Sequence, residues 1–463
     1  AVRMDSYRSL TNYDLLAGNT QEPAADLEEL ADWLATLAPQ STIDEVIIAR
    51  RRQHAAHEVG HTLGLPHNFI ASKYGRASVM DYPAPLIRLN SGRLDLSEAY
   101  ARGTGAWDTL AIRFAYTEFP EAEEEAGLAA IVAEMFAKNA EFITNPDNGA
   151  AGSYPEASPW DNGSDAVAEL ARVTDVRRYL MEHFDDRAIK PGAPMFLLGR
   201  RFAFTYLHHR WALESAIKAV GGMEFHYARR GDPIPPTRIV DGARQRRALQ
   251  LVLQALSPAE LAIPERLLRL FAPRPFGAAA DRWAFGSKAG PAFDQVGAAR
   301  SLASYTVRTL LHPERAARLV AFSARDASLP TLEEVIGSLV DGTWTAVPEG
   351  GTGAVGRAVQ RVVVDELIRL AADADATVEA RAAAEWGLRR IAGRLAVGER
   401  TTAASPGEAH RTLAAADIQR FLDRRAAATG LSTPLAIPPN MPLIPMGGGT
   451  NEQGRSAAPP RRP

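Results

Sequence analysis

The segment from residue 57 to residue 67 constrains this chain more strongly than any other part of its sequence. It reads H-E-V-G-H-T-L-G-L-P-H, and its first two histidines, His57 and His61, are four residues apart. Residues with that spacing lie on one face of an α-helix, so both imidazoles can reach the same metal ion from one rigid element. A capping-box pattern at 42–45, followed by several turns without proline or glycine, predicts a helix over about residues 43–64.

The residues after the second histidine bring a third one toward the same point. Gly64 can adopt a positive φ and end the helix, and Pro66 prevents the helix from continuing, so His67 can approach from another side. Three neutral imidazole nitrogens leave a fourth position open, as in a catalytic zinc site, so Zn²⁺ is the predicted cofactor. Glu58 is poorly placed to be a ligand but well placed to contact a water beside the metal, which is the position of a general base.

Gly60 interrupts the helix-forming run between the two helical histidines. A glycine inside a helix costs about 1 kcal/mol relative to alanine, so its presence requires a reason. A close approach of neighbouring backbone to the helix at this position would provide one.

A second motif, Ser-Val-Met-Asp-Tyr at residues 78–82, follows His67 after a short loop. Together with the histidine motif it resembles the Met-turn of the metzincin metallopeptidases, in which a methionine lies beneath the zinc site. The resemblance implies that Met80 supports the site and that Tyr82 binds zinc or stabilises the tetrahedral intermediate. Asp81 replaces the histidine that precedes this tyrosine in astacins and serralysins, so the alternative is a tyrosine that packs at the edge of the cleft.

The amino-acid residues of both motifs resemble even more closely those of the large bacterial zinc-dependent metallopeptidases that carry a Met-zincin domain. Residues 105–116 resemble the G-P-Y-D-x-x-A-I segment of these proteins, with departures at Ala106 and Trp107. The strong resemblance covers residues 43–116, and a looser one continues to around residue 275. It implies a zinc-dependent endopeptidase that acts on a peptide or protein and is exported to the periplasm or the exterior of a bacterium.

Composition narrows the remaining classes of function. The chain has 463 residues and a formal net charge of −3, so nothing indicates a nucleic-acid partner. It has no cysteine, which excludes disulfides and thiolate ligands, and no run of 18 apolar residues that would predict a membrane span. No signal-peptide pattern follows Ala1, and the oligomeric state stays open.

The predicted fold class is mainly α. A metzincin-like catalytic region, with the long zinc-binding helix, the Met-turn and a short hairpin over 86–96, is expected to precede a helical C-terminal region. The metzincins have a β-sheet before the zinc helix, but residues 26–34 of this chain are typical of a helix, so the region is expected to be truncated and to lack that sheet. The expected divisions are a catalytic part at 1–120, helical regions at 121–275 and 276–430, and a disordered Pro/Gly-rich tail at 431–463.

Helical periodicity dominates after the hairpin. The expected helices cover residues 122–141, 164–184, 199–220, 243–256, 294–311, 331–340, 355–373, 376–395 and 408–426, with a short helix that starts at Pro258. A long loop is expected at 142–163, bordering the substrate cleft, with linkers at 228–242 and 272–292. His54 lies close enough in sequence to contact the site, but a partly exposed helix position is expected for it.

Three functions are compatible with these residues. The first is a zinc endopeptidase in which Glu58 takes a proton from the attacking water. The second is a non-catalytic zinc-containing scaffold that binds a partner, because the sheet that forms one edge of the cleft is expected to be missing. The third is a metal-dependent amidase that acts on a non-peptide substrate.

Overall fold

The structure is a computed structural model that carries side chains. It describes residues 33, 37, 38, 43–145, 147–278, 284–346, 350–397 and 405–423. Helices account for most of them, which confirms the mainly α fold. The helix expected at 26–34, apart from Trp33, and the tail expected at 431–463 lie outside the described residues, as does nearly all of the chain before residue 43.

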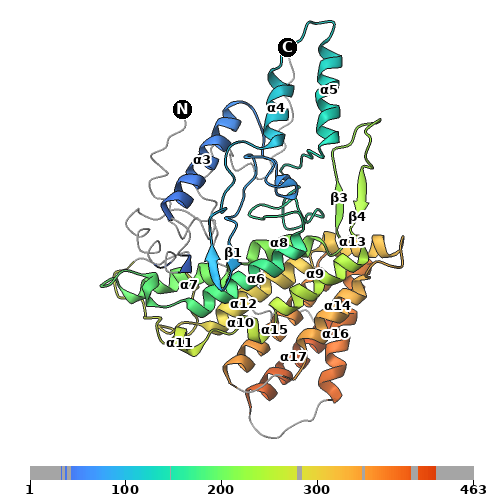
Figure 1. The fold of residues 1–463 in the computed structure, drawn as a ribbon. Helices are drawn as coiled ribbons and strands as arrows, with labels where there is room; N and C mark the ends of the chain where they lie inside the picture. The colour runs from blue at the N-terminus through green and yellow to red at the C-terminus, as the bar shows by residue number, and fades with distance from the viewer. Residues whose placement is uncertain are drawn as a thin grey trace, which may run out of the picture.

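The N-terminal part of the described chain places three helices and a hairpin among long loops (Figure 1). Its elements are α3 (Ile43–Thr62), η3 (Ala71–Tyr74), β1 (Arg88–Asn90), β2 (Arg93–Asp95), α4 (Ala106–Tyr116) and α5 (Glu124–Ala137). β1 and β2 pair antiparallel, with Leu89 opposite Leu94, and Ser91 and Gly92 in the turn both have positive φ. This confirms the hairpin predicted between residues 86 and 96.

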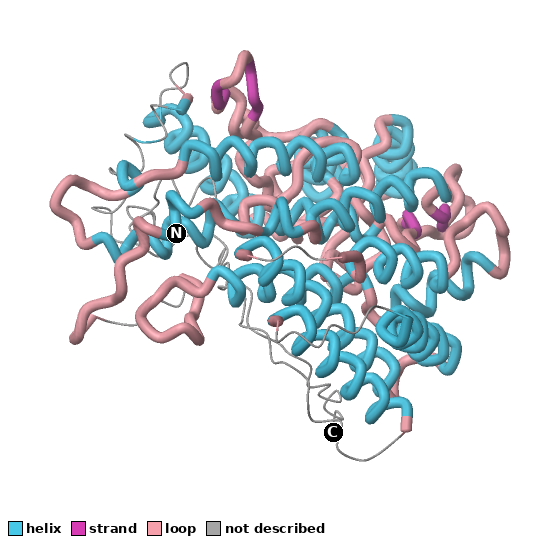
Figure 2. The backbone as a smooth tube through the Cα atoms, turned by 90° about the horizontal axis from the view of Figure 1, so that it is seen from below, coloured by secondary structure: helices cyan, strands magenta, loops and turns pink. Residues whose placement is uncertain are grey.

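The rest of the described chain is a stack of helices that lie side by side, as Figure 2 shows from below. Its helices are α6 (Ala166–His183), η4 (Asp186–Ala188), η5 (Met195–Leu197), α7 (Leu198–Tyr206), α8 (Arg210–Lys218), α9 (Gly242–Ala255), α10 (Pro258–Leu261), α11 (Glu265–Leu268), α12 (Gln295–Leu310), α13 (Pro313–Ser323), α14 (Leu332–Thr343), α15 (Gly351–Ala372), α16 (Val378–Val397) and α17 (Pro406–Leu422). Most of them match the predicted helices within a few residues.

The prediction of a single helix over residues 199–220 is wrong, because the structure has two helices, α7 and α8, with a break between them. The break has no proline or glycine to mark it in the sequence. Instead, Arg177 of α6 donates from Nε to the carbonyl oxygen of Tyr206 at 2.8 Å, and Arg210 donates from Nη1 to that of Leu207 at 2.9 Å. These guanidinium groups satisfy the carbonyls at the end of α7, where helical hydrogen bonds stop.

Several further elements differ from the sequence prediction, and α4 and α11 are among the helices that it did not include. The linker predicted at 228–242 contains a strand, β4 (Thr237–Ile239), which pairs antiparallel with β3 (Met223–Phe225). α13 was not predicted, although His312 caps its start and Pro313 occupies its first position. That pattern is typical of a helix N-terminus and could have revealed α13.

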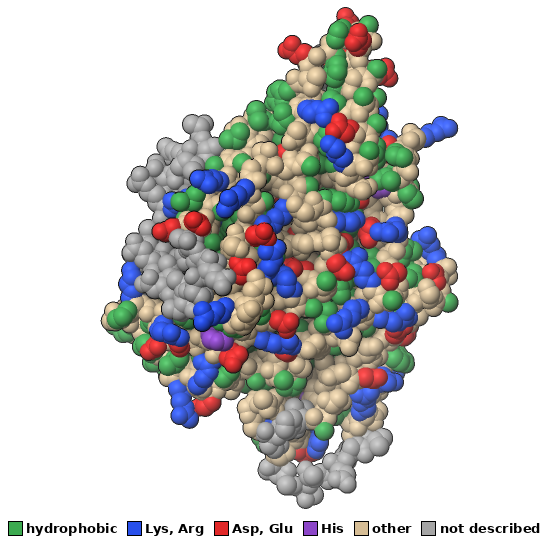
Figure 3. All heavy atoms as spheres, in the orientation of Figure 1, with side chains coloured by type: hydrophobic (Ala, Val, Ile, Leu, Met, Phe, Trp, Pro, Cys, Tyr) green, Lys and Arg blue, Asp and Glu red, His purple; other side chains and the backbone are tan. Residues whose placement is uncertain are grey.

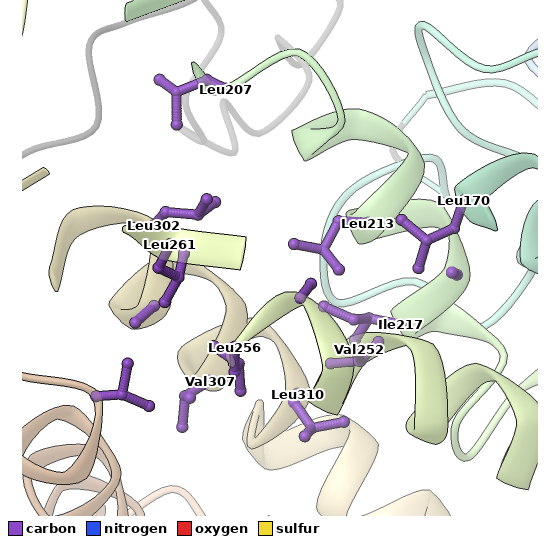
Figure 4. Close-up of a cluster of buried hydrophobic side chains, with 14 of the residues drawn as sticks. Leu170, Leu207, Leu213, Ile217, Val252, Leu256, Leu261, Leu302, Val307 and Leu310 are labelled. Atoms are coloured by element: carbon purple, nitrogen blue, oxygen red, sulfur yellow. The ribbon is translucent and has the colours of Figure 1, made fainter. Parts of the chain in front are cut away.

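One large hydrophobic core joins the helices to the first hairpin. Buried side chains of the cluster reach from Val46 through Leu94 on β2 to Ile418 on α17. Figure 4 shows its centre, with labelled side chains from α6, α8, α9, α10 and α12 that point toward one another, among them Leu170, Leu213, Val252 and Leu302. The domain boundaries predicted from the sequence remain predictions.

The described surface is charged but mixed. In Figure 3, basic and acidic side chains are interspersed over the described part of the visible face, in line with the small net charge. Among the described helices, none has the length and apolar character needed to cross a lipid bilayer.

Candidate metal centre

The three histidines of the motif converge on one point. His57 and His61 lie on α3, while His67 comes from the loop that follows it. One ring nitrogen from each of the three lies within 4.8 Å of the other two, and Nε2 of His61 is 3.2 Å from Nε2 of His67. Within the described residues, this is the only such group of three potential metal-binding side chains.

The other ring nitrogen of each histidine has an oxygen partner. Nδ1 of His57 lies 2.6 Å from the carbonyl oxygen of Val79, and Nδ1 of His61 lies 2.8 Å from that of Leu65. Nδ1 of His67 lies 3.1 Å from Oδ1 of Asn145. Carbonyl oxygens only accept, so each Nδ1 carries the proton and each Nε2 carries a lone pair. Three lone pairs therefore face one another.

This arrangement fits a zinc ion. In a tetrahedral site with Zn–N distances of about 2.0–2.1 Å, two ligand nitrogens lie roughly 3.3 Å apart, close to the separation of the His61 and His67 Nε2 atoms. Nε2 of His57 is buried and makes no hydrogen bond with the described residues. Burial lowers the pKa of His57 to about 2 and also lowers the pKa of His67, so both stay neutral, as metal ligands must be.

The end of α3 directs the third histidine toward the first two. Gly64 has a φ of 84°, a left-handed conformation that side chains other than glycine rarely adopt. The amide of Leu65 then donates back to the carbonyl oxygen of Gly60 at 3.0 Å. This turn, which was predicted from Gly64 and Pro66, reverses the chain and returns His67 to the face of α3 that carries His57 and His61.

Met80 lies directly against the zinc helix. It is fully buried, and its Sδ contacts Gly60 so closely that a Cβ atom at position 60 would overlap it. The close approach expected at Gly60 is therefore real, but it is made by a methionine side chain and not by neighbouring backbone. Met80 and Gly60 together define how near the Met-turn lies to the histidine ligands.

The variant Gly60→Ala is expected to destabilise the protein although alanine favours helices. Alanine gains about 1 kcal/mol in helix propensity, whereas displacing a packed side chain such as Met80 costs about 1–3 kcal/mol. Thermal unfolding should show a lower Tm, and zinc affinity should fall. Gly393→Ala in α16 is the matched control, because a Cβ there meets nothing within 4 Å, and it should raise Tm. An equal rise in both variants would contradict the role of Met80.

A carboxylate at the start of α4 holds the Met-turn in place. Asp108 is buried, and its Oδ2 accepts hydrogen bonds from the amides of Val79 (2.8 Å) and Gly105 (2.7 Å). Its Oδ1 accepts one from the hydroxyl of Ser78 at 2.6 Å. Because the carbonyl of Val79 is the partner of His57, Asp108 orients this histidine through one intervening residue.

Glu58 lies beside the ligands with a histidine as its partner. Nε2 of His54 is 3.2 Å from Oε1 of Glu58, one turn along α3. The expectation of a partly exposed His54 is wrong, since its side chain is buried against Glu58 and near His57. Burial, with a contribution from the charge of Arg50, lowers the pKa of His54 to about 3, so at neutral pH it is uncharged beside the Glu58 carboxylate.

Tyr82 reaches the same centre from the Met-turn. Its Oη lies 2.9 Å from Nε2 of His67, and its ring packs against those of His67 and Trp160. The amide of Trp160 donates to the carbonyl oxygen of Tyr82 at 2.7 Å, which fixes the backbone at that position. Burial raises the pKa of Tyr82 to about 12, and the nearby charge of Glu58 contributes, so its hydroxyl remains protonated at neutral pH.

Some residues that support the site were not singled out from the sequence. Asn145 lies in the loop predicted at 142–163, but nothing in the sequence relates it to His67. Asp108 lies in the segment that resembles other family members, yet its contact with the Met-turn depends on the fold. The sequence does place His54 near the site, and its spacing of four residues from Glu58 on a helix could also have indicated its neighbour.

Comparison with known proteins adds one finding. The model of a protein family described as Met-zincin matches residues 39–351, a range that contains α3, the Met-turn and the helices through α14. Neither the curated proteins nor the solved structures contain a significant match.

Proposed function

Since this chain belongs to the Met-zincin family, we propose that it is a zinc-dependent endopeptidase that hydrolyses peptide bonds in peptides or proteins. Family membership supports a zinc metallopeptidase in general, and the proposal adds the roles of individual residues. The observation that carries it is the set of three Nε2 lone pairs directed at one point, with the Glu58 carboxylate on the next residue after His57. Export from a bacterial cell, expected from the resemblance, forms part of the same proposal.

Each residue of the site has a separate role in the proposed reaction. His57, His61 and His67 hold zinc, which when bound acts as a Lewis acid that lowers the pKa of water and polarises a carbonyl group. Glu58 accepts the proton of the attacking water and returns it to the nitrogen of the leaving amine. His54 borders Glu58 on α3, with its Nε2 3.2 Å from Oε1 of the carboxylate.

Tyr82 supplies a hydrogen-bond donor for the charge that develops on the scissile carbonyl oxygen. Its high pKa suits this role, because a phenol that stays protonated can donate to an oxyanion. Its contact with His67 places the hydroxyl at the edge of the metal centre, within reach of a group bound there.

The variant Tyr82→Phe is expected to keep zinc but to lose roughly 10²-fold in kcat, the usual effect of removing one oxyanion donor. KM should change much less, because the interaction forms in the transition state. Steady-state kinetics on a quenched fluorescent peptide, with metal analysis of the same sample, measures both. Tyr179→Phe on α6 is the control. Unchanged kcat in Tyr82→Phe would leave only the alternative in which this tyrosine packs at the edge of the cleft.

The proposal as a whole is tested by zinc content and proteolysis together. One zinc per chain and cleavage of denatured casein that stops after zinc removal and returns with zinc are the expected results. One zinc without cleavage of casein or of a peptide library would instead support the non-catalytic scaffold. Cleavage of small amides but not of peptides would support the amidase.

A further inference from the structure

A pocket lies between α5 and the hairpin of β3 and β4, which stand next to each other in Figure 1. The volume of this α5–hairpin pocket is about 550 Å³, within the range of about 300–1,000 Å³ that is usual for ligand sites. A ligand can enter it from solvent, because three of its lining residues are exposed, namely Asn139, Tyr227 and Pro235. Its described lining contains none of the residues assigned above to the metal centre.

Apolar side chains line the α5–hairpin pocket from both elements. They include Val132, Met135 and Phe136 from α5, and Phe225, Tyr227 and Ile234 from the hairpin. Tyr227 is 48% exposed, so part of this apolar surface stays in contact with water. A ligand that covers the surface with an apolar group therefore gains free energy from the hydrophobic effect.

Both lysine and arginine side chains of the lining already have a carboxylate partner. Lys73 donates from Nζ to the hydroxyl of Tyr154 at 2.5 Å and to Oε2 of Glu224 at 3.3 Å. Arg238 donates from Nη2 to the same oxygen of Glu224 at 2.6 Å. Neither cation is therefore available to pair with an acidic ligand unless it first gives up Glu224.

The other carboxylates of the lining are engaged as well. Glu141 accepts a hydrogen bond from the hydroxyl of Tyr154 at 2.7 Å, and Asp232 accepts one from the amide of Arg229 at 2.6 Å. His226 is the remaining imidazole of the lining. A charged ligand group that leaves water without gaining a partner is costly, so the lining favours an uncharged apolar occupant.

One wall of the α5–hairpin pocket is continuous with the packing around the Met-turn. Ala140 and Phe142 line the pocket, and with Met135 they pack against the cluster that contains Met80 and Trp107. The rings of Phe142 and Trp107 are stacked, with centroids 5.6 Å apart and an angle of 7° between their planes. The pocket therefore shares its wall with the structure that supports the metal centre.

The same wall leads directly to the third histidine. Phe142 is three residues before Asn145, whose Oδ1 lies 3.1 Å from Nδ1 of His67. Three residues of extended chain span at most about 11 Å. From the hairpin side, the hydroxyl of Tyr227 accepts a hydrogen bond at 3.3 Å from the amide of Thr144, the residue directly before Asn145. The pocket therefore adjoins the metal centre on the side of Nδ1 of His67.

We infer that the α5–hairpin pocket binds a large apolar side chain of the peptide substrate, such as phenylalanine or leucine, a few residues away from the scissile bond. The inference rests on the proposed function, because it adds a side-chain preference to the same peptidase centre. Residues of an extended peptide are about 3.3 Å apart, so a peptide bound at the three histidines can reach the pocket with a nearby side chain. Burial of a side chain of that size strengthens binding roughly tenfold or more.

Peptide binding without turnover tests the inference. The Glu58→Gln chain, loaded with zinc, is titrated into fluorescently labelled decapeptides of glycine, serine and alanine in which a single phenylalanine is moved through every position. Fluorescence anisotropy is expected to show one position at which phenylalanine binds roughly tenfold more tightly than alanine. Tighter binding of arginine or glutamate than of phenylalanine at that position would overturn the inference.

Variants in the Glu58→Gln background assign the preference to the α5–hairpin pocket. Val132→Trp fills the pocket from α5 and is expected to abolish the preference for phenylalanine over alanine. Ala133→Trp is the matched control, because Ala133 is the exposed neighbour on the same helix and does not line the pocket, so the preference should persist. If Val132→Trp fails to fold, Ile234→Ala decides the question, because it removes apolar surface from the hairpin side and should reduce the preference severalfold. An unchanged preference in both pocket variants would overturn the inference.

Cleavage of the same peptides by the natural chain separates this inference from the proposed function. Peptides that bind through the pocket but are never cleaved would contradict the proposed function and support the pocket. Cleavage of all peptides at equal rates, both by the natural chain and by Val132→Trp, would overturn the inference and support the peptidase.

Discussion

Replacing Glu58 with glutamine is expected to lower kcat by about 10²–10⁴-fold while one zinc per chain remains bound. Glutamine keeps the shape of the side chain and its place beside His54, but it cannot take a proton from water. The ligands His57 and His61 on the same helix are unchanged, so metal content should not fall. Single-turnover cleavage of a peptide, measured together with zinc by atomic absorption, gives both quantities on one sample.

Glu45→Gln provides the matched control for this variant. Glu45 is an exposed glutamate in the first turn of the same helix, so its replacement should leave kcat and zinc content unchanged. Full activity in Glu58→Gln would contradict the assignment of Glu58 as the general base. Loss of zinc together with activity would mean that Glu58 acts mainly by holding the site together.

Replacing Asp108 with alanine is expected to have the second large effect, on stability and on zinc affinity together. The change leaves the Ser78 hydroxyl, the buried amide of Val79 and the half-buried amide of Gly105 without their acceptor. Hydrogen bonds to a charged group contribute about 1.5–3 kcal/mol each and do not add fully, so a loss of roughly 3–5 kcal/mol is expected. Because Val79 orients His57, zinc affinity should fall by about 10- to 100-fold, the usual effect of losing an outer-shell partner.

Asp294→Ala is the control that distinguishes the effect of Asp108 on the Met-turn from the effect of losing an ordinary helix cap. Asp294 caps α12 through the amide of Gly297 at 2.7 Å, and its loss should cost only about 1 kcal/mol without any change in zinc affinity. Urea unfolding of zinc-free protein and competition with a zinc indicator measure the two effects separately. Similar zinc affinities in Asp108→Ala and the natural chain would show that the Met-turn keeps its position without the carboxylate.

The features of the site that depend on local spacing could be predicted from the sequence. The pairing of His57 with His61 follows from one helix, and the return of His67 follows from the turn at Gly64. The main elements of the helical region could be predicted for the same reason, because their apolar residues repeat with helical period.

The features that depend on distant contacts could not be predicted. At the break between α7 and α8, one of the exposed carbonyls is satisfied by Arg177, which comes from another helix. The burial of His54 depends on how α3 packs in the tertiary structure, and helical periodicity alone does not reveal that. The contact of Gly60 with a methionine side chain, and not with backbone, likewise depends on tertiary packing.

The oxygen that orients His67 belongs to Asn145, which is 78 residues further along the chain, and this separation orders the acquisition of the metal during folding. His57 and His61 can meet zinc as soon as α3 forms, but two ligands on one helix release the ion readily. The third ligand becomes fully oriented only after residues 141–145 have docked against the segment that follows it, through contacts that close slowly because they are remote in sequence. We therefore expect zinc to be held tightly only late in folding, when the tertiary structure of the chain is already complete.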